Sequence, residues 1–336
     1  MKAYRFDKFD GLDDLRMREE ADPQPQRGEV LVRVRAVSLN FRDIAMLRGR
    51  YPRAYRPGHI PASDAAGEVV AVGEGVEAFK LGDRVMGTFH PRWFGGEMPS
   101  TILSDSYGAL NDGWLTELKA VSQEAVVPLP GALTYEEAST LPCAGLTAWT
   151  ALTGPRPIRA GHSVLVQGSG GVSIFALQLA RAAGATVFAT TSSDGKIDVL
   201  KALGAQEVVN YVAEPEWGKR VRLLAGGRGV DRVVEVGGPG TIAQSLRAVA
   251  VEGEIASIGF LSTDNPGIDF FALKASGASF RNIVVGDRAG LLELNRAVAA
   301  TGLKPIIDKV FAFEDAQAAF AHLESGAHLG KVVIRV

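Results

Sequence analysis

The sequence predicts an α/β protein made of two parts: a doubly wound parallel sheet, and a second, discontinuous part that is mainly β and barrel-like. Three observations support this prediction. Short strands and closely spaced glycine turns fill the first third of the chain, strand and helix patterns alternate between residues 163 and 285, and the tail returns to strand, helix and strand. A chain of 336 residues is also long enough for about two domains.

Composition narrows the class of protein before any motif is considered. Hydrophobic residues make up 46% of the chain and charged residues 22%, which excludes a disordered chain. Lys and Arg number 36 and Asp and Glu 38, so the net charge of −2 predicts binding to neither nucleic acid nor membrane. Residues 1–15 carry charges throughout, unlike a secretory signal, and Cys143 is the only cysteine. We expect a cytoplasmic protein that acts on a small molecule.

The first third has the pattern of short antiparallel strands. Valines alternate with arginines in residues 29–38, the period of two expected of a half-buried strand. A valine-rich strand follows at 65–72, and the glycine turns after it are typical of a barrel. Residues 88–113 are rich in Pro, Gly, Ser and aromatic residues, which predicts a long irregular loop.

The middle of the chain predicts a parallel sheet with right-handed crossovers, because strands and helices alternate there. Residues 172–183 place apolar side chains three and four apart, as in an amphipathic helix, and 194–203 and 241–249 are further helices. The predicted strands are 163–167, 186–190, 207–210, 231–235, 253–258 and 279–285.

The tail changes character again. It predicts a strand at 309–313, a helix at 314–324 and a final strand at 331–335. We expect these elements to rejoin the N-terminal part. The predicted domains are therefore 1–128 together with 286–336, and 129–285.

A glycine-rich turn joins the first strand of the middle part to its amphipathic helix. In VLVQGSGGVSIFALQLA, the absence of side chains at Gly168, Gly170 and Gly171 lets backbone amides approach a pyrophosphate at the positive end of the helix. Ser173 replaces the last glycine of the G-x-G-x-x-G pattern. The flanking strand and helix favour dinucleotide binding over a glycine turn without a ligand.

The end of the second strand indicates which dinucleotide is bound. About 20 residues after the glycines, where an acid would hold the ribose of NAD, the chain has Thr191 in the run TTSSDGK. Thr191, Ser192 and Lys196 offer hydroxyls and an ammonium suited to a 2′-phosphate, which favours NADPH. Asp194 is expected to be the N-cap of the next helix, although it could instead reach the ribose and favour NAD.

These motifs together resemble the medium-chain dehydrogenase/reductase superfamily, over essentially the whole chain. The resemblance rests on GEVLVRVRAVSLNFRD, IPASDAAGEVVAVGEGVEAFKLGDRV, LPCAGLTAW, the Gly168–Ser173 turn and the terminal GKVVIRV. The chain is most similar to the zinc-free quinone oxidoreductases and enoyl reductases, whose relatives are often named alcohol dehydrogenases. The resemblance implies a Rossmann domain with a GroES-like catalytic domain, and a homodimer formed through the outer strand at 279–285.

The residues at the family's zinc positions are not zinc ligands. Zinc members have a cysteine at the position of Asn40, three residues before the shared Asp43. They have a histidine at the position of Ser63, followed by a glutamate where this chain has Asp64, and His59 lies four residues too early to replace that histidine. Because catalytic zinc needs three deprotonated ligands, we expect no zinc.

The absence of a Lewis acid bears on the reaction. Reduction of a conjugated C=C bond or a quinone places the developing charge on a conjugated oxygen, which hydrogen bonds can stabilise. The predicted activity is therefore zinc-independent, NAD(P)H-dependent hydride transfer to an enone, an enoyl compound or a quinone. An NAD(P)-dependent alcohol dehydrogenase or aldehyde reductase is the alternative, and a dinucleotide-binding protein without turnover is a second one.

The resemblance also implies roles for polar residues of the N-terminal part. Tyr51 matches a tyrosine proton donor of mitochondrial-type enoyl reductases; otherwise it is a loop residue before a proline. Asn40 matches a residue that faces the nicotinamide and its ribose. Asp43 and Asp64 are expected to support the site, and Arg42 is either a salt-bridge partner of Asp43 or an anchor for an anionic substrate.

The remaining candidates lie near the hinge and at strand ends. Cys143 is expected to be a small buried side chain rather than a nucleophile. Residues after the fourth and fifth strands are expected near the cofactor, or else they form ordinary turns. The predicted cofactor-binding residues are Asn40, Thr147, Gly168, Ser169, Gly170, Gly171, Val172, Thr191, Ser192, Lys196, Val236, Gly237, Gly259 and Phe260.

Overall fold

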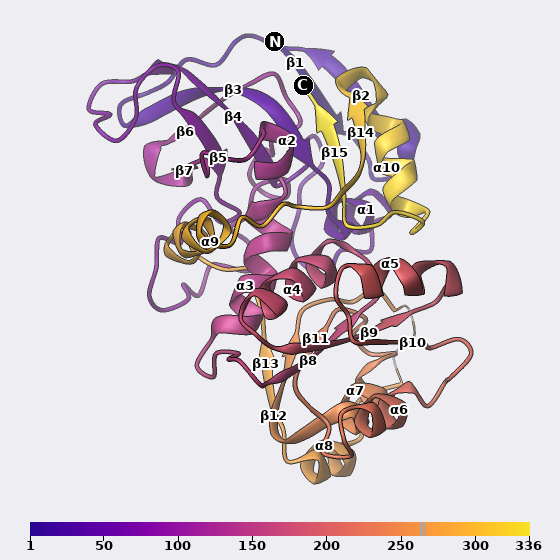
Figure 1. Cartoon of the computed structure of the whole chain (residues 1–336). Helices are drawn as coiled ribbons and strands as arrows, with labels where there is room; N and C mark the ends of the chain where they lie inside the picture. The colour runs from indigo at the N-terminus through magenta and orange to yellow at the C-terminus, as the bar shows by residue number, and fades with distance from the viewer. Residues whose placement is uncertain (263, 265) are drawn as a thin grey trace. The chain divides into compact units, whose positions relative to one another are not determined.

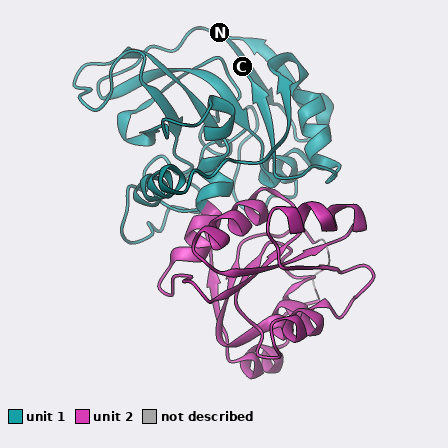
Figure 2. Cartoon of the chain, viewed as in Figure 1, with its two compact units in different colours: residues 1–146, 285–336 teal, residues 147–284 magenta. Residues whose placement is uncertain are grey.

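The protein divides into two compact units, shown together in Figure 1 and coloured separately in Figure 2. The computed structural model describes residues 1–262, 264 and 266–336. Unit 1 consists of Met1–Leu146 and Val285–Val336, and unit 2 of Thr147–Val284. The division after Leu146 lies later than the predicted boundary at 128. The reason is that α2 (Tyr135–Ala138) still packs on strands of unit 1.

Unit 1 is built on a mainly antiparallel seven-stranded sheet, which confirms the predicted β part. The strand order is β14-β15-β3-β4-β5-β7, with β6 paired to β3. The tail returns to this sheet because β15 pairs antiparallel with β3, placing Val333 opposite Ser38. The elements are β1 (Lys2–Phe6), β2 (Leu15–Glu19), β3 (Glu29–Ser38), α1 (Phe41–Leu47), β4 (Asp64–Val72), β5 (Arg84–Gly87), β6 (Leu118–Ser122), β7 (Val126–Pro128), α2, α9 (Arg288–Thr301), β14 (Ile307–Ala312), α10 (Ala316–Glu324) and β15 (Lys331–Arg335).

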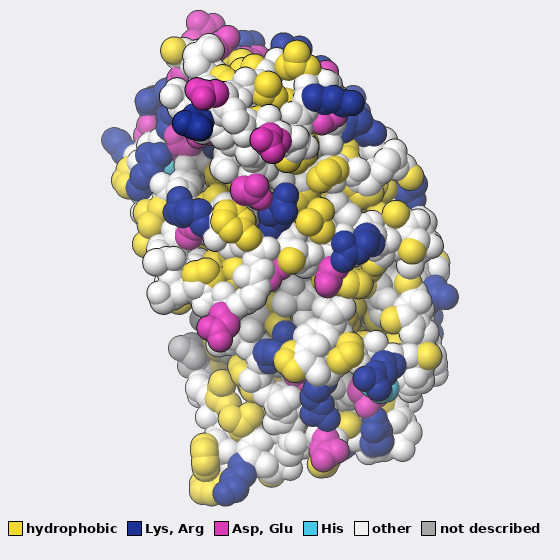
Figure 3. Space-filling model, turned by 90° about the vertical axis from the view of Figure 1, so that its left-hand side faces the viewer, with side chains coloured by type: hydrophobic (Ala, Val, Ile, Leu, Met, Phe, Trp, Pro, Cys, Tyr) yellow, Lys and Arg dark blue, Asp and Glu magenta, His cyan; other side chains and the backbone are white. Residues whose placement is uncertain are grey.

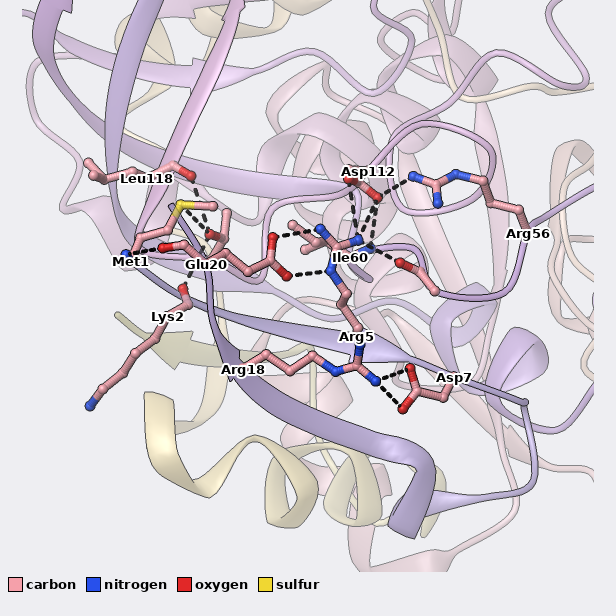
Figure 4. A network of polar contacts seen from close by, with 12 residues as sticks. Met1, Lys2, Arg5, Asp7, Arg18, Glu20, Arg56, Ile60, Asp112 and Leu118 are labelled. Carbon is pink, nitrogen blue, oxygen red and sulfur yellow. Dashed lines mark hydrogen bonds and ion pairs between the residues drawn. The ribbon is translucent and has the colours of Figure 1, made fainter. Parts of the chain in front are cut away.

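Polar contacts fasten the N-terminal strands to the loops of unit 1 (Figure 4). Arg5 on β1 donates to the carboxylate of Glu20 at 2.7 Å and to the carbonyl of Gly58. Asp112 accepts from Arg56 at 2.5 Å and lies 3.4 Å from Arg5. These contacts connect the first strand to two loops that are far apart in sequence.

The loop at 88–113 is irregular, as predicted, but it is anchored. Phe89 and Ile102 are buried, and the His90 imidazole contacts the carbonyl of Asp105 at 2.6 Å. On the face of the molecule shown in Figure 3, positively and negatively charged side chains are mixed. Within the described residues, no helix combines the length and apolar character needed to cross a membrane.

Unit 2 is a six-stranded parallel sheet with the order β10-β9-β8-β11-β12-β13. This is the doubly wound order, which reverses between β8 and β11, where such sheets bind ligands at the carboxyl ends of their strands. β13 ends at Asn282, three residues before the predicted 285, because the strand it pairs with, β12, ends opposite it at Ser257. The elements are α3 (Leu146–Thr153), β8 (Ser163–Gln167), α4 (Gly171–Ala182), β9 (Thr186–Thr191), α5 (Ile197–Ala202), β10 (Glu207–Asn210), α6 (Trp217–Leu224), β11 (Val230–Glu235), α7 (Ile242–Ala248), β12 (Val249–Ser257), α8 (Phe270–Ser276) and β13 (Ser279–Asn282).

Candidate active site

The beginning of α1 places two predicted site residues together in unit 1. Asn40 is the N-cap of this helix, and the Asp43 carboxylate accepts the backbone N–H of Asn40 at 2.8 Å. This contact is one half of a capping box, which satisfies an otherwise orphaned amide at the helix start. Asp43 is fully buried and Asn40 is 8% exposed, so the local cap also fixes both side chains inside unit 1.

The beginning of β4 brings Asp64 to the same place. Ser63 Oγ donates to Asp64 Oδ1 at 2.6 Å, and the Cys143 backbone N–H donates to Asp64 Oδ2 at 3.1 Å. Cys143 lies in the first turn of a helix, where backbone N–H groups have no partner within the helix. Asn40 Nδ2 lies 3.5 Å from Ser63 Oγ, which joins the two groups of residues.

Lys331 completes this site, and the sequence analysis did not single it out. It is the first residue of β15, is 3% exposed, and donates to Asn40 Oδ1 at 2.6 Å and to the carbonyl of Leu39 at 2.5 Å. We call Asn40, Ser63, Asp64, Cys143 and Lys331 the polar chain. The only sequence signal for Lys331 is a lysine beginning an otherwise apolar strand.

Burial governs the electrostatics of these residues. It raises the pKa of Asp43 to about 6, against the opposing influence of the Arg42 guanidinium. Burial likewise raises the pKa of Asp64, while the Lys331 ammonium opposes that rise, and burial lowers the pKa of Lys331. Burial also raises the pKa of the Cys143 thiol, so it is protonated near neutral pH and is a poor nucleophile.

Arg42 holds the irregular loop, a role that the sequence did not indicate. Its guanidinium donates to the carbonyl of Tyr107 at 2.7 Å and to Ser106 Oγ at 2.9 Å, and the side chain is 7% exposed. The same guanidinium lies 5.3 Å from the ring centre of Tyr51. Arg42 therefore fixes the 88–113 loop and places a positive charge next to Tyr51. Its charge also lowers the pKa of Asp43, and anchoring of an anionic substrate stays a prediction.

The donors gathered around Asp64 do not suit a catalytic zinc ion. Asn40 and Ser63 offer neutral groups where catalytic zinc needs deprotonated N, S or O ligands. The Lys331 ammonium makes direct contact with Asn40, so a cation there would meet a like charge. Among the described residues, no group of three or more His, Cys, Asp or Glu side chains could hold a metal ion.

In unit 2, the glycine turn has the geometry that a phosphate group requires. A Cβ atom built on Gly168 or Gly170 meets no protein atom within 4 Å, so packing within the protein does not explain either glycine. Gly170 directly precedes α4, whose first N–H groups point out of the helix. Ser173 is 1% exposed and donates to the Gln167 carbonyl at 2.6 Å, so it fits where the motif has glycine. This open cradle fits a dinucleotide.

The residues expected around the ribose differ in their surroundings. Lys196 Nζ donates to Ser169 Oγ at 3.1 Å, which places its ammonium beside the glycine turn, and Ser192 is exposed. Thr191 is 2% exposed and its hydroxyl contacts the backbone of Ser193, so it stabilises the turn. Its burial makes it a weaker cofactor contact than the sequence implied.

Asp194 is not the N-cap that the sequence predicted. Ser193 precedes the 3₁₀ turn Asp194–Lys196, which leads into α5, and no side chain caps it. The Asp194 carboxylate instead accepts from Asn210 Nδ2 at 2.6 Å. This contact to the end of β10 satisfies the carboxylate away from the glycine turn.

The loop after β11 is held by a buried carboxylate that the sequence analysis missed. Glu235 is fully buried and accepts from the backbone N–H groups of Gly237 and Gly238 at 2.9 Å, from Thr241 Oγ1 at 2.5 Å, and from Gln167 Nε2 at 2.7 Å. The Glu235 carboxylate therefore fixes the carboxyl ends of β8 and β11 at the point where the strand order reverses.

Packing alone explains two of the other predicted glycines. A Cβ on Gly259 would lie 2.0 Å from the Val236 carbonyl, and one on Gly237 would lie 2.3 Å from Thr241 Oγ1. Thr147 is 3% exposed at the start of unit 2, and Phe260 and Val172 are half-buried. Contact with a cofactor stays a prediction for all of these residues.

Comparisons with known proteins agree with this architecture. Residues 26–131 match the family model described as alcohol dehydrogenase GroES-like domain, and residues 171–300 match that described as zinc-binding dehydrogenase. A zinc-type alcohol dehydrogenase-like protein of Schizosaccharomyces pombe is 37% identical over 98% of this chain and 97% of its own length. A 2-methylene-furan-3-one reductase of Solanum lycopersicum is 32% identical over 99% of this chain and 79% of its own.

Solved structures agree as well. A putative alcohol dehydrogenase from Sinorhizobium meliloti is 40% identical, with a TM-score of 0.91, covering 100% of this chain and 99% of that one. The Escherichia coli quinone oxidoreductase in complex with NADPH is 26% identical with a TM-score of 0.85, and the match covers both chains fully. The chain belongs to the medium-chain dehydrogenase/reductase superfamily, in its quinone oxidoreductase-like branch. It is an oxidoreductase that uses a nicotinamide dinucleotide.

We predict that Gly170→Val weakens cofactor binding without weakening the fold. The new side chain meets no protein atom at its Cβ but fills the space a phosphate needs. Dinucleotide affinity measured by titration calorimetry should fall more than about tenfold, while the melting temperature should change by at most a few degrees. Gly131→Val, at another glycine whose Cβ meets no protein atom, is the matched control. Equal affinities for wild type and Gly170→Val would remove this turn from the binding site.

The raised pKa of Asp43 predicts a pH-dependent stability. Between about pH 4 and 6 the folded protein keeps a proton that the unfolded chain has lost, so Asp43 lowers stability as pH rises through this window, by ~3 kcal/mol in all. Asp43→Asn removes this effect. Urea unfolding should show the variant gaining stability relative to wild type from pH 4 to 6, and parallel curves would contradict the assignment.

Proposed function

We propose that the protein is a zinc-independent, NADPH-dependent reductase of an activated C=C bond in a conjugated carbonyl compound, or of a quinone. One observation carries the proposal: at the positions of the superfamily's zinc ligands the chain has Asn40 and Ser63, and Asn40 is hydrogen-bonded to the buried ammonium of Lys331. A site built in this way stabilises developing negative charge with hydrogen bonds and a fixed cation.

The preference for NADPH is supported by the surroundings of the glycine turn. Lys196 Nζ lies 3.1 Å from Ser169 Oγ, and Ser192 is exposed nearby in sequence, so an ammonium and hydroxyls surround the place where a 2′-phosphate is expected. Asp194, the carboxylate that could have favoured NAD, is paired with Asn210. The related quinone oxidoreductase of known structure is in complex with NADPH.

A dinucleotide held at the Gly168–Gly171 turn would supply, in the proposed mechanism, a hydride for the β-carbon of the substrate. The electron pair of the C=C bond moves toward the carbonyl oxygen, and the resulting enolate takes one proton at its α-carbon. Tyr51 donates that proton, with the Arg42 guanidinium beside its ring stabilising the phenolate. Asn40 would face the nicotinamide of that cofactor, as its match to the family implies. The Asp43 carboxylate accepts from the Asn40 backbone N–H and Asp64 accepts from the Ser63 hydroxyl, which holds both residues in place.

A substrate panel tests this function. The wild-type protein, loaded with NADPH, is mixed with enones, enoyl thioesters, quinones and aldehydes, and cofactor oxidation is followed by absorbance in a stopped-flow instrument. The proposal expects oxidation with conjugated acceptors and much slower oxidation with simple aldehydes. Faster aldehyde reduction, or alcohol oxidation with NAD, would favour an alcohol dehydrogenase instead. Binding without turnover on the whole panel would favour a non-catalytic dinucleotide-binding protein.

Lys196→Ala tests the 2′-phosphate assignment. Removing the ammonium should weaken NADPH binding by about tenfold, the effect of roughly 1.4 kcal/mol, and should change NADH binding little. Lys201→Ala, an exposed lysine on α5 paired with Glu207, is the control. Affinities measured by fluorescence titration that fall equally for both cofactors would refute the assignment.

Tyr51→Phe tests the proton donor. Loss of the hydroxyl should lower kcat about 100-fold or more, the usual contribution of general acid catalysis, while NADPH affinity is retained. Tyr55→Phe is a matched control, because its ring centre lies 6.2 Å from that of Tyr51 and no role is assigned to it. If both variants turn over as fast as the wild type, protonation comes from another group.

A further inference from the structure

Lys331 is buried, and its burial is explained by hydrogen bonds that its ammonium donates within the candidate active site. Taking an ammonium out of water costs several kcal/mol unless its hydrogen bonds and charge are compensated. Lys331 Nζ is compensated by the Leu39 carbonyl and by Asn40 Oδ1. Because β15 pairs with β3, Lys331 lies beside the residues that follow β3. The C-terminal strand therefore places this ammonium at the beginning of α1.

The ammonium determines which way the Asn40 amide points. Lys331 can only donate hydrogen bonds, so the atom of Asn40 that faces it must be Oδ1, and Nδ2 must face Ser63. Ser63 Oγ then accepts from Asn40 and donates to Asp64 Oδ1 at 2.6 Å. Each bond of the polar chain therefore fixes the direction of the next, and turning the amide over would place two donors against each other.

The ammonium also offsets buried negative charge. After burial itself, Lys331 is the strongest influence on the pKa of Asp64, and it also lowers the pKa of Asp43. Both carboxylates are fully buried. Without Lys331, both would bind protons more readily, and Asp64 would no longer be a reliable acceptor for Ser63 and the Cys143 amide.

We propose that Lys331 is a positioning residue of the catalytic centre, which orients the Asn40 amide and supplies the fixed positive charge of the polar chain. Its effect on catalysis rests on the proposed zinc-independent reduction, in which no metal ion supplies that charge. Its effect on Asn40 rests on the hydrogen bonds alone and can be measured without turnover.

Lys331→Met, Lys331→Arg and Lys119→Met test the proposal. Lys119 is a half-buried lysine, whose ammonium donates to the Asp112 carbonyl at 2.8 Å and lies over the Trp114 ring, so its variant controls for losing a partly desolvated ammonium. Lys331→Met should lower kcat about 100-fold, as misplacement of a catalytic group does, with NADPH affinity within about twofold of wild type. Lys331→Arg should recover part of the loss. Lys119→Met should lower the melting temperature but keep kcat.

Two further measurements separate positioning from a general loss of structure. In the double variant Lys331→Met/Asn40→Ala, the fold-reduction in kcat should be no greater than in Asn40→Ala alone. The reason is that Lys331 acts on kcat through Asn40. The side-chain amide signals of Asn40 in ¹H–¹⁵N NMR spectra should shift in Lys331→Met and not in Lys119→Met. Lys331→Gln is measured in parallel, so that a variant retaining a donor is available if Lys331→Met folds poorly.

The outcomes distinguish this proposal from the proposed function. An unchanged kcat in Lys331→Met, losses that multiply with Asn40→Ala, or unmoved Asn40 amide signals would each overturn the positioning role. Turnover by the wild type only with alcohols would overturn the proposed function, while a shift of the Asn40 signals in Lys331→Met would still support the positioning role.

Discussion

The direction of one buried series of hydrogen bonds constrains the chemistry of unit 1. Lys331 donates to Asn40, Asn40 faces Ser63, Ser63 donates to Asp64, and Asp64 also accepts the Cys143 amide. Because an ammonium stands at one end, the orientation of every later group is determined. The members come from four separate segments, so the sheet of unit 1 and its returning tail must form before the series can exist.

Unit 2 shows how the same residue type serves two purposes. Gly168 and Gly170 leave open space that no protein atom fills, whereas Gly237 and Gly259 are required because backbone and side chains approach them closely. The Glu235 carboxylate holds Gly237 in place by accepting the backbone N–H groups of Gly237 and Gly238. A rigid strand end beside an open glycine turn allows a dinucleotide to bind with little reorganisation of the protein.

The sequence predicted the fold class and many element limits, because apolar periodicity depends only on local spacing. The predicted strands 163–167, 207–210 and 331–335 match β8, β10 and β15. The polar chain could not be predicted in this way, because residues 40, 63, 143 and 331 meet only through strand pairing. Lys331 in particular has the pattern of an exposed strand end, and its burial follows from the pairing of β15 with β3. The contacts of Arg42 with the 88–113 loop and of Asp194 with Asn210 were missed for the same reason, since these partners are distant in sequence.

We propose that this oxidoreductase transfers hydride with hydrogen bonds and an ammonium in place of a metal ion. The most direct test is elemental analysis of the purified, active enzyme, combined with activity before and after exhaustive chelation. The account predicts zinc far below one atom per chain and turnover that chelation leaves unchanged. Zinc bound at one atom per chain, with turnover lost on its removal and regained on its return, would contradict the account.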